Sequence, residues 1–258
     1  MMETVDRLRA LLEQRRNRAE IYSRSDYWDR KAQELDGSAV SMWRNRHLNE
    51  LYHAEQTALI EALAPDVAGL DVLDVGCGTG RMSAYFANRG AKVVGVDFAS
   101  SAIEIARRDH AAATIDYRVG SVFELPFEAE FDLAISWGTL TIASRTHADL
   151  AVALERIRAA LRPGGRALLL EPVHDSFLHR VLRISEREFL AAMSAAGFDV
   201  LEVRHMHFWP ARLALAFIEW PRSVTRAAYA AGDGVMGAIF RRRRFGDYQM
   251  FHAARTGT

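Results

Sequence analysis

The segment with the clearest capacity for chemistry reads VLDVGCGTGR and covers Val72–Arg81. An apolar run that contains Asp74 leads into Gly76, Gly78 and Gly80, and a helical pattern follows. Glycines allow a tight turn and a close approach of backbone to a ligand, and the N-terminus of a helix favours negative groups. By itself, such a loop fits either a nicotinamide-dinucleotide site or a tight turn without chemical importance.

Three further features narrow the interpretation of this loop. Its spacing is G-x-G-x-G, because position 81 is arginine, whereas the dinucleotide pattern is G-x-G-x-x-G. Asp97 ends the next apolar run, where a carboxylate can hold the two hydroxyls of a ribose. The turn LRPGG at 161–165 then leads into another apolar run. On these motifs, in this order, the chain resembles the class I S-adenosylmethionine-dependent methyltransferases over about residues 57–204.

The resemblance implies a binding site for S-adenosylmethionine and its product S-adenosylhomocysteine. In that family the glycines at 76, 78 and 80 lie under the methionine part of the cofactor. Asp74 corresponds to an acid near the cofactor's amino group, or alternatively it orders the loop. Asp97 corresponds to the residue that holds both ribose hydroxyls.

Other positions of the expected cofactor site follow the second, third and fourth apolar runs. Phe98 is expected to pack against the adenine, or alternatively only in the core. Ser121 stands where the family usually has an acid that accepts a hydrogen bond from the adenine amine, and the backbone of Val122 is a further contact. Ser136 and Trp137 lie where the family's cofactor meets its substrate. Cys77 is interpreted as a small packing residue, and no metal site is predicted.

Methyl transfer depends strongly on alignment of the reacting atoms, but some acceptors need a base to remove a proton. Glu171 and His174 are the leading candidates because they follow the fifth apolar run directly, on the edge of the sheet where such sites form. His147 is a third candidate, and His205 and His207 are two more. Each of these side chains has an alternative role as a surface or capping group.

Apolar runs and helical patterns alternate from about residue 70 to 204, which predicts parallel strands joined by crossover helices. The predicted strands are 70–75, 91–97, 114–119, 131–136, 166–171 and 198–203, and a last strand covers 247–255. Helices are expected from Thr79, near Ser100, over 147–161 and from Ser185. The resemblance implies an α/β, Rossmann-like fold with a seven-stranded, mostly parallel sheet whose last strand is antiparallel.

Residues 1–65 form a predicted helical N-terminal lid, followed by a methyltransferase domain at 66–258. The lid segment is rich in aromatic residues: Tyr22, Tyr27, Trp28, Trp43 and Tyr52. These rings, Tyr27 among them, are expected to shield the cofactor, or alternatively to pack the helices onto the domain. A hinge is predicted at Gly37, and the lid is expected to close when ligand binds.

A helical insert is predicted at 205–247, with helices over 211–220 and 222–240. It contains the apolar stretches LALAFIEW and GVMGAIF and ends in four arginines, 241–244. The insert is interpreted as a substrate cap or a homodimer contact. The alternative is a membrane-surface helix over 208–244 that lies on anionic lipid.

The composition of the 258 residues excludes several classes of protein. The single cysteine cannot form an intrachain disulfide, which favours the cytoplasm. Acidic and basic residues balance at 33 each, so bulk charge predicts no nucleic-acid partner. The first 20 residues lack the apolar core of a signal peptide, and no apolar run reaches the ~20 residues of a membrane span.

The leading hypothesis from the sequence is a methyltransferase that acts on oxygen or nitrogen of a small-molecule acceptor. Its first alternative is the same chemistry on a lipid-linked or quinone-like acceptor at the membrane. The second alternative is a protein that binds S-adenosylmethionine without catalysis.

Overall fold

The computed structural model describes residues 17–34, 43–238 and 246–257. Seven strands form one sheet: β1 (Asp71–Val75), β2 (Lys92–Asp97), β3 (Ile115–Val119), β4 (Phe131–Trp137), β5 (Leu161–Glu171), β6 (Phe198–Phe208) and β7 (Gly246–Arg255). Their order across the sheet is β3-β2-β1-β4-β5-β7-β6. The first five strands pair in parallel, and β7 runs antiparallel to both β5 and β6. The predicted α/β fold with an antiparallel last strand is therefore confirmed.

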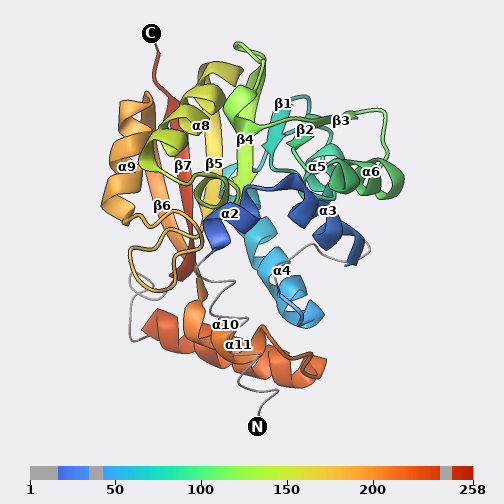
Figure 1. The fold of residues 1–258 in the computed structure, drawn as a ribbon, viewed down its shortest axis with the longest axis vertical. Coiled ribbons are helices and arrows are strands. Elements are labelled where there is room, and N and C mark those ends of the chain that lie inside the picture. The colour runs from blue at the N-terminus through green and yellow to red at the C-terminus, as the bar shows by residue number, and fades with distance from the viewer. Residues whose placement is uncertain (1–16, 35–42, 239–245, 258) are drawn as a thin grey trace.

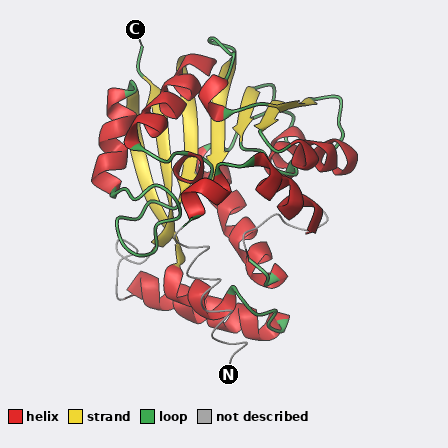
Figure 2. Ribbon diagram, in the orientation of Figure 1, coloured by secondary structure: helices red, strands yellow, loops and turns green. Residues whose placement is uncertain are grey.

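Helices cover both faces of this sheet (Figure 2). The helices of the described residues are α2 (Arg18–Tyr22), α3 (Ser25–Glu34), α4 (Arg46–Leu63), α5 (Arg81–Ala87), α6 (Ser100–Asp109), α7 (Leu140–Ala143), α8 (His147–Ala160), α9 (Glu186–Ala195), α10 (Trp209–Leu215) and α11 (Arg222–Ala238), with the short 3-10 helix η1 at Val122–Glu124. A capping box of Ser185 and Glu188 starts α9, at the predicted residue, and Thr146 and Asp149 start α8 in the same way.

The core explains why several strands read as continuous apolar runs. In β5, Ala167 and Leu169 belong to the cluster on the α8 and α9 face, whereas Leu168 and Leu170 belong to the cluster on the α4 and α5 face. Successive side chains of a strand point to opposite faces, so a sheet covered on both sides needs apolar residues at every position. The helix α4 shares the second of these clusters through Leu48 and other residues.

Several boundaries differ from the sequence-based expectation. The segment 161–165, predicted as a turn, lies within β5, where the register against β4 shifts. The helix expected from Thr79 begins at Arg81, because Gly80 adopts a left-handed conformation with φ of 84° at the N-cap. Strand β6 continues beyond residue 203 to Phe208.

The helices α10 and α11 lie beyond the end of β6 (Figure 1), where α11 packs against α4 and α10 packs against α11 and β6. They occupy the predicted insert. Helix α10 begins at Trp209 and ends at Leu215, where 211–220 was predicted, and α11 begins at the predicted residue 222 and is described as far as Ala238. The four arginines at 241–244 and the predicted hinge at Gly37 lie outside the described residues. Within the described ranges, no helix is long and apolar enough to cross a membrane.

Candidate active site

A cavity of about 370 Å³ lies at the edge of the sheet where the parallel strands end. Its wall follows the strand order, with Ser121 after β3, Asp97 at the end of β2 and Gly76 after β1. Trp137 ends β4, and Tyr248 lies near the start of β7. Because β7 is antiparallel, its first residues reach the same edge as the last residues of the parallel strands. The cavity therefore spans the sheet edge from β3 to β7.

The glycine loop lines the cavity through Gly76 and Gly78, and each has a different reason to lack a side chain. A Cβ atom at Gly76 would overlap the side chain of Thr139, which follows β4. A Cβ atom at Gly78 would meet no atom within 4 Å, although its φ of 53° disfavours other residues. The backbone N–H of Gly78 donates to the carboxylate of Asp97 at 2.9 Å. The loop is thus tied to the end of β2.

Gly80 does not line the cavity, contrary to the expected cofactor contact. It precedes α5 with a positive φ, and a Cβ atom there would overlap the hydroxyl of Tyr117 on β3. Its role in the structure is to let the loop pass close to Tyr117 and start the helix.

The carboxylate of Asp97 is positioned as expected for binding a diol. Its Oδ2 accepts from Gly78 and its Oδ1 accepts from the backbone N–H of Ala99, each at 2.9 Å. Burial raises the pKa of this carboxyl, and the two backbone hydrogen bonds oppose that shift. Each carboxylate oxygen accepts more than one hydrogen bond, so both remain able to bind hydroxyl groups from the cavity.

Asp74 lies at the floor of the cavity and is 1% exposed. Ser83 of α5 donates to its Oδ2 at 2.7 Å. Burial raises the pKa of Asp74 to about 7, whereas the Ser83 hydroxyl lowers it. A ligand cation at this position would favour the ionised carboxylate.

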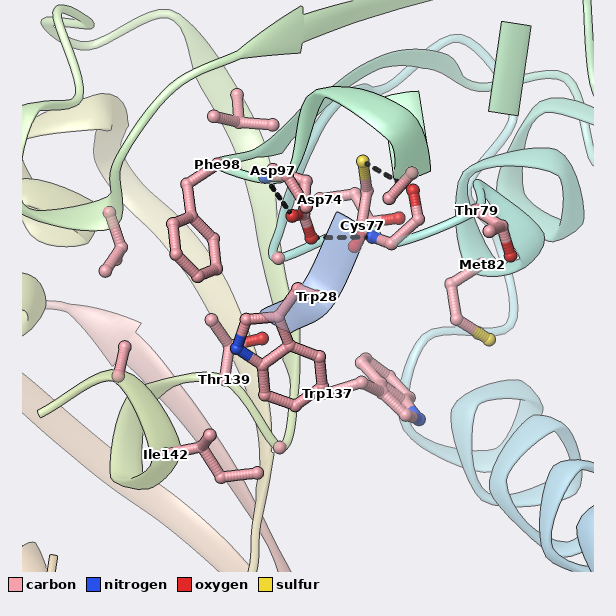
Figure 3. Close-up of a pocket in the computed structure, with 18 of the residues that line it drawn as sticks. Trp28, Asp74, Cys77, Thr79, Met82, Asp97, Phe98, Trp137, Thr139 and Ile142 are labelled. Carbon is pink, nitrogen blue, oxygen red and sulfur yellow. Dashed lines mark hydrogen bonds between the residues drawn. The ribbon is translucent and has the colours of Figure 1, made fainter. Parts of the chain in front are cut away.

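The opposite end of the cavity from Tyr248 is formed by Phe98, Ser121 and Val122. The Ser121 hydroxyl caps η1 by accepting from the N–H of Phe123 at 3.2 Å, so its proton remains free to be donated. Phe98 is half-buried beside Asp97 (Figure 3). Together these residues form a shallow apolar surface with one hydroxyl, which suits the face and edge of an adenine ring.

Trp28 of α3 covers the cavity between Asp97 and Trp137 (Figure 3). Its ring packs against Tyr22, which also lines the cavity, at a centroid distance of 5.4 Å. Tyr27 packs on both rings but does not line the cavity, so the ring of this helix that faces the cavity is Trp28.

The end of the cavity toward β7 is aromatic and includes Trp43, Tyr52, Trp137 and Tyr248. The indole N–H of Trp137 is buried and has no hydrogen-bond partner among the described residues. Flat ring surfaces with an unpaired donor are suited to a planar ligand that carries an acceptor atom.

One face of α4 adds polar groups that the sequence analysis did not assign. Asn49, Tyr52 and Gln56 all line the cavity, and each has a buried oxygen with no hydrogen-bond partner in the described chain. Their spacing of three and four residues places them on one side of a helix. The sequence shows this spacing, which groups the three residues on one face. It does not show which face of the helix meets the cavity, and that is why they were not assigned.

Glu171, the leading candidate base, is fully buried and does not line the cavity. It accepts hydrogen bonds from the backbone N–H groups of Thr139, Leu140 and Thr141 and from the hydroxyl of Thr141. Ser136, expected at the cofactor, also donates to Glu171, at 3.2 Å, and points away from the cavity. The structure thus places Glu171 as a positioning residue that joins β5 to the first turn of α7.

His174 also lies outside the cavity, in contact with Asp247 of β7. Its Nε2 is 2.9 Å from the carbonyl oxygen of Asp247, whose fully buried carboxylate also contacts Arg180 and Arg212. Burial would raise the pKa of Asp247, but Arg180, His174 and Arg212 lower it overall. This buried ionic cluster lies behind Tyr248 and holds the strand that carries it.

The remaining histidine candidates are not brought to the cavity either. His147 is exposed at the start of α8. His205 pairs with Glu186 at 3.2 Å. His207 is buried and stacks on the Tyr52 ring at 3.6 Å, while its Nε2 lies 3.2 Å from Nε2 of Gln56. His207 therefore contacts two cavity residues from behind.

Comparison with known proteins supports the identity that this geometry indicates. A family model described as a methyltransferase domain matches residues 72–165. The chain is 29% identical over 211 residues to a ubiquinone biosynthesis O-methyltransferase of Azorhizobium caulinodans, which covers 73% of this chain and 81% of that protein. It is 33% identical over 118 residues to a demethylmenaquinone methyltransferase of Lactococcus lactis, covering 43% of this chain and 45% of that protein.

A crystal structure of an S-adenosylmethionine-dependent methyltransferase from Mesorhizobium loti has the same fold. It superimposes with a TM-score of 0.58 at 21% identity, over 78% of this chain and 98% of that one. With its motifs, its sheet order and these matches, the chain belongs to the class I S-adenosylmethionine-dependent methyltransferase family.

Proposed function

We propose that this protein transfers a methyl group from S-adenosylmethionine to an oxygen or nitrogen atom of a small-molecule acceptor with a planar ring. The observation that carries the proposal is the continuity of the cavity, which joins Asp97 at one end to Trp137 and Tyr248 at the other. The first end suits the cofactor and the second an aromatic acceptor. Relatives named as O-methyltransferases favour oxygen as the acceptor atom.

When bound, S-adenosylmethionine supplies a methyl group on a sulfonium, and its sulfur retains the electron pair of the broken carbon–sulfur bond. Asp97 and the glycine loop hold the cofactor's ribose and methionine parts. The aromatic walls at Trp137 and Tyr52 orient the acceptor, exclude water and attract the sulfonium charge. Alignment of the two partners is the main contribution expected of the protein.

The described wall toward β7 contains no carboxylate and no imidazole. We therefore expect the acceptor to enter in ionised form, or to release its proton to water. The phenol groups of Tyr52 and Tyr248 stay protonated and cannot accept this proton, because burial raises the pKa of each well above its ordinary value.

The proposal is tested by incubating the protein with S-adenosylmethionine and a panel of phenols, catechols and aromatic amines. S-adenosylhomocysteine formation that depends on an acceptor supports it. Trp137→Ala should slow this reaction more than it weakens S-adenosylhomocysteine binding. Tight binding without turnover on any acceptor would favour the non-catalytic alternative.

A second candidate function is methylation of a lipid-linked or quinone-like acceptor at a membrane surface. The observation that favours it is an insert patch, defined as Leu213, Phe217, Ile218, Trp220 and Val224, whose side chains are all exposed. Phe217 is 63% exposed and Ile218 is 56% exposed. Exposed apolar groups next to arginines are suited to an anionic membrane, and Arg222 and Arg226 are exposed on the adjoining turns of α11.

Cosedimentation with phosphatidylglycerol vesicles tests the membrane candidate. Phe217→Glu should release the protein from the vesicles, whereas Leu201→Glu, at an exposed position of β6, should not. Equal recovery of both variants with the vesicles would contradict this candidate. Loss of a dimer in Phe217→Glu, without any vesicle binding by the parent protein, would assign the patch to a homodimer contact. The cytoplasmic location stays a prediction.

A further inference from the structure

Two side-chain amides of α4, Asn49 and Gln56, line the cavity in a half-paired state. Asn49 is 3% exposed and Gln56 is 6% exposed. In each amide the nitrogen contacts a neighbouring group, whereas the oxygen has no hydrogen-bond donor in the described chain. A buried acceptor without a donor destabilises the protein, and a ligand that brings the donor removes that cost.

The orientation of the Asn49 amide follows from its partner. Its Nδ2 lies 2.9 Å from the carbonyl oxygen of Trp43. A carbonyl oxygen only accepts hydrogen bonds, so the amide must turn its N–H to Trp43 and keep Oδ1 as the unused group. Trp43 itself lines the aromatic end of the cavity, which places Asn49 at the end proposed for the acceptor.

The orientation of the Gln56 amide follows from a chain of buried hydrogen bonds. Nδ1 of His207 lies 3.2 Å from Oε2 of Glu55, which also accepts from the hydroxyl of Tyr229. A carboxylate only accepts, so Nδ1 carries the proton and Nε2 of the neutral imidazole is the acceptor. That Nε2 lies 3.2 Å from Nε2 of Gln56, which therefore donates and leaves Oε1 unused.

His207 is held firmly enough to fix this arrangement. It is fully buried, and its φ of 60° is uncommon for a residue other than glycine. Such a conformation persists only where the surroundings enforce it. The imidazole also stacks on the Tyr52 ring at 3.6 Å, and Tyr52 lies between Asn49 and Gln56 on the cavity face of α4. His207 thus acts as a positioning residue for two groups of the wall.

These orientations define the ligand group that the wall can bind. Two neutral oxygens accept hydrogen bonds from hydroxyl or amino groups, and they repel the carbonyl or carboxylate oxygens of a ligand. Asn49 and Gln56 are seven residues apart, a rise of about 10 Å along a helix, so a ligand that reaches both is longer than one ring.

We propose that Asn49 and Gln56 select an elongated aromatic acceptor that carries a neutral hydrogen-bond donor, a hydroxyl or an amino group, at two separated positions. The inference rests on the proposed function, because it names the acceptor class of the same cavity. Glu55 and His207 set the polarity of the site, since they determine that Gln56 offers its oxygen and not its nitrogen.

Binding of three matched probes tests the inference without any methyl transfer. The full chain is labelled with 15N-tryptophan and saturated with S-adenosylhomocysteine, and the indole signals of Trp28, Trp43 and Trp137 report on the cavity that they line. The probes are 2,6-dihydroxynaphthalene with two donors, 2-naphthol with one, and 2-methoxynaphthalene with none. Each added donor should tighten binding by about 3- to 10-fold, the range for a neutral hydrogen bond.

Two glutamine variants separate the cavity contact from a general effect. Gln56→Met retains the length of the side chain and removes the oxygen, so it should abolish one of the two steps in affinity. Its affinity for 2-methoxynaphthalene and for S-adenosylhomocysteine should stay within about twofold of the parent protein. Gln33→Met is the matched control, because Gln33 is exposed and contacts Ser101 outside the cavity, and it should bind all probes as the parent does.

His207→Phe tests the positioning role. Phenylalanine retains a ring on Tyr52 but lacks the Nε2 that orients Gln56, so the amide can turn either group to a ligand. The ratio of the affinities for 2-naphthol and 2-methoxynaphthalene should fall toward one. A purely structural role would weaken both probes by the same factor and leave that ratio unchanged. Thermal unfolding verifies that each variant is folded, and the ranking of the probes on the parent protein needs no variant.

Three results would overturn the inference. The first is equal affinity of the parent complex for the three probes, or no binding of 2,6-dihydroxynaphthalene. The second is a loss of S-adenosylhomocysteine affinity in Gln56→Met, which would assign this amide to the cofactor. The third is efficient methylation of an acceptor that has only its reacting hydroxyl, which would keep the proposed function and remove the selection by α4.

Discussion

Glu171 accepts two hydrogen bonds from Thr141, one from its backbone N–H at 3.0 Å and one from its hydroxyl at 2.9 Å. The pair joins the end of β5 to α7, whose residues Ile142 and Ala143 line the cavity. A buried carboxylate that accepts from several backbone donors holds a loop in place, and it has no free path to an acceptor.

Replacing Glu171 should therefore affect the fold before the chemistry. Glu171→Ala leaves the N–H groups of Thr139, Leu140 and Thr141 without their acceptor, at about 1–3 kcal/mol for each buried unsatisfied group. We expect a large decrease in the free energy of unfolding, measured by urea denaturation. His147→Ala, at an exposed position, should leave stability nearly unchanged. If Glu171→Ala were as stable as the parent protein but had lost all turnover, Glu171 would again be the leading candidate for the general base.

Asp97 should dominate cofactor affinity. Asp97→Ala removes two charge-assisted hydrogen bonds to the ribose, each worth roughly 1.5–3 kcal/mol, and it also releases the N–H groups of Gly78 and Ala99. Ser121→Ala should cost much less, since a neutral hydrogen bond contributes about 1 kcal/mol. Calorimetry with S-adenosylhomocysteine measures both variants. Unchanged affinity in Asp97→Ala would rule out the ribose assignment.

The glycines of the loop should separate binding from stability. Gly78→Ala adds a methyl group at the cavity wall, where no protein atom lies within 4 Å, so its main effect should be on cofactor affinity. Gly80→Ala meets the Tyr117 hydroxyl and should mainly lower the melting temperature. Gly164→Ala, with a φ of 76° and open space around it, reports the backbone strain alone, about 1–2 kcal/mol. The geometry would be contradicted if Gly80→Ala mainly weakened cofactor binding and Gly78→Ala mainly lowered the melting temperature.

Asp74 should make stability depend on pH. Its pKa is about 7 in the folded chain against 3.8 in the unfolded one, so the folded state binds more protons between these values. The free energy of unfolding of the ligand-free protein should then fall as pH rises from about 4 to 7, by roughly 2–4 kcal/mol. Asp74→Asn should reduce this dependence in urea denaturation at pH 5 and pH 8, and the part that remains is expected from Asp97 and Glu171, whose pKa values burial also raises. A slope in Asp74→Asn equal to that of the parent protein would assign it to another group.

Cofactor affinity should show the opposite trend with pH. An ammonium pairs with the ionised carboxylate, so S-adenosylhomocysteine should bind the parent protein more tightly at pH 8 than at pH 6. Ser83→Ala removes the hydroxyl that lowers the pKa of Asp74 and should shift the change to higher pH. Calorimetry at several pH values follows both effects, and a flat profile in the parent protein would refute the contact.

The helix α3 should become more protected when cofactor binds. It contacts the sheet domain through Asp29, which accepts from the N–H of Ser101 at 2.7 Å, and through the buried Ala32. Trp28 of this helix covers the cavity, so a ligand adds contacts to it. Hydrogen exchange with and without S-adenosylhomocysteine should show a larger change over 25–34 than over 147–160. Equal exchange in the two states would make α3 a fixed layer rather than a lid.

The sequence by itself determined the strands, their alternation with helices, the glycine loop and Asp97. These features depend on local rules, because apolar runs, glycine conformations and strand ends are properties of short segments. The antiparallel direction of β7 was also predicted, through resemblance to the family and not from the residues of that strand.

The tertiary structure alone decided which neighbours face the cavity. Ser136 and Trp137 are adjacent, yet Ser136 points to Glu171 and Trp137 to the cavity, since successive residues of a strand alternate between faces. Tyr248 reaches the site because β7 returns antiparallel. Such choices depend on contacts between segments distant in the chain, which no local pattern records.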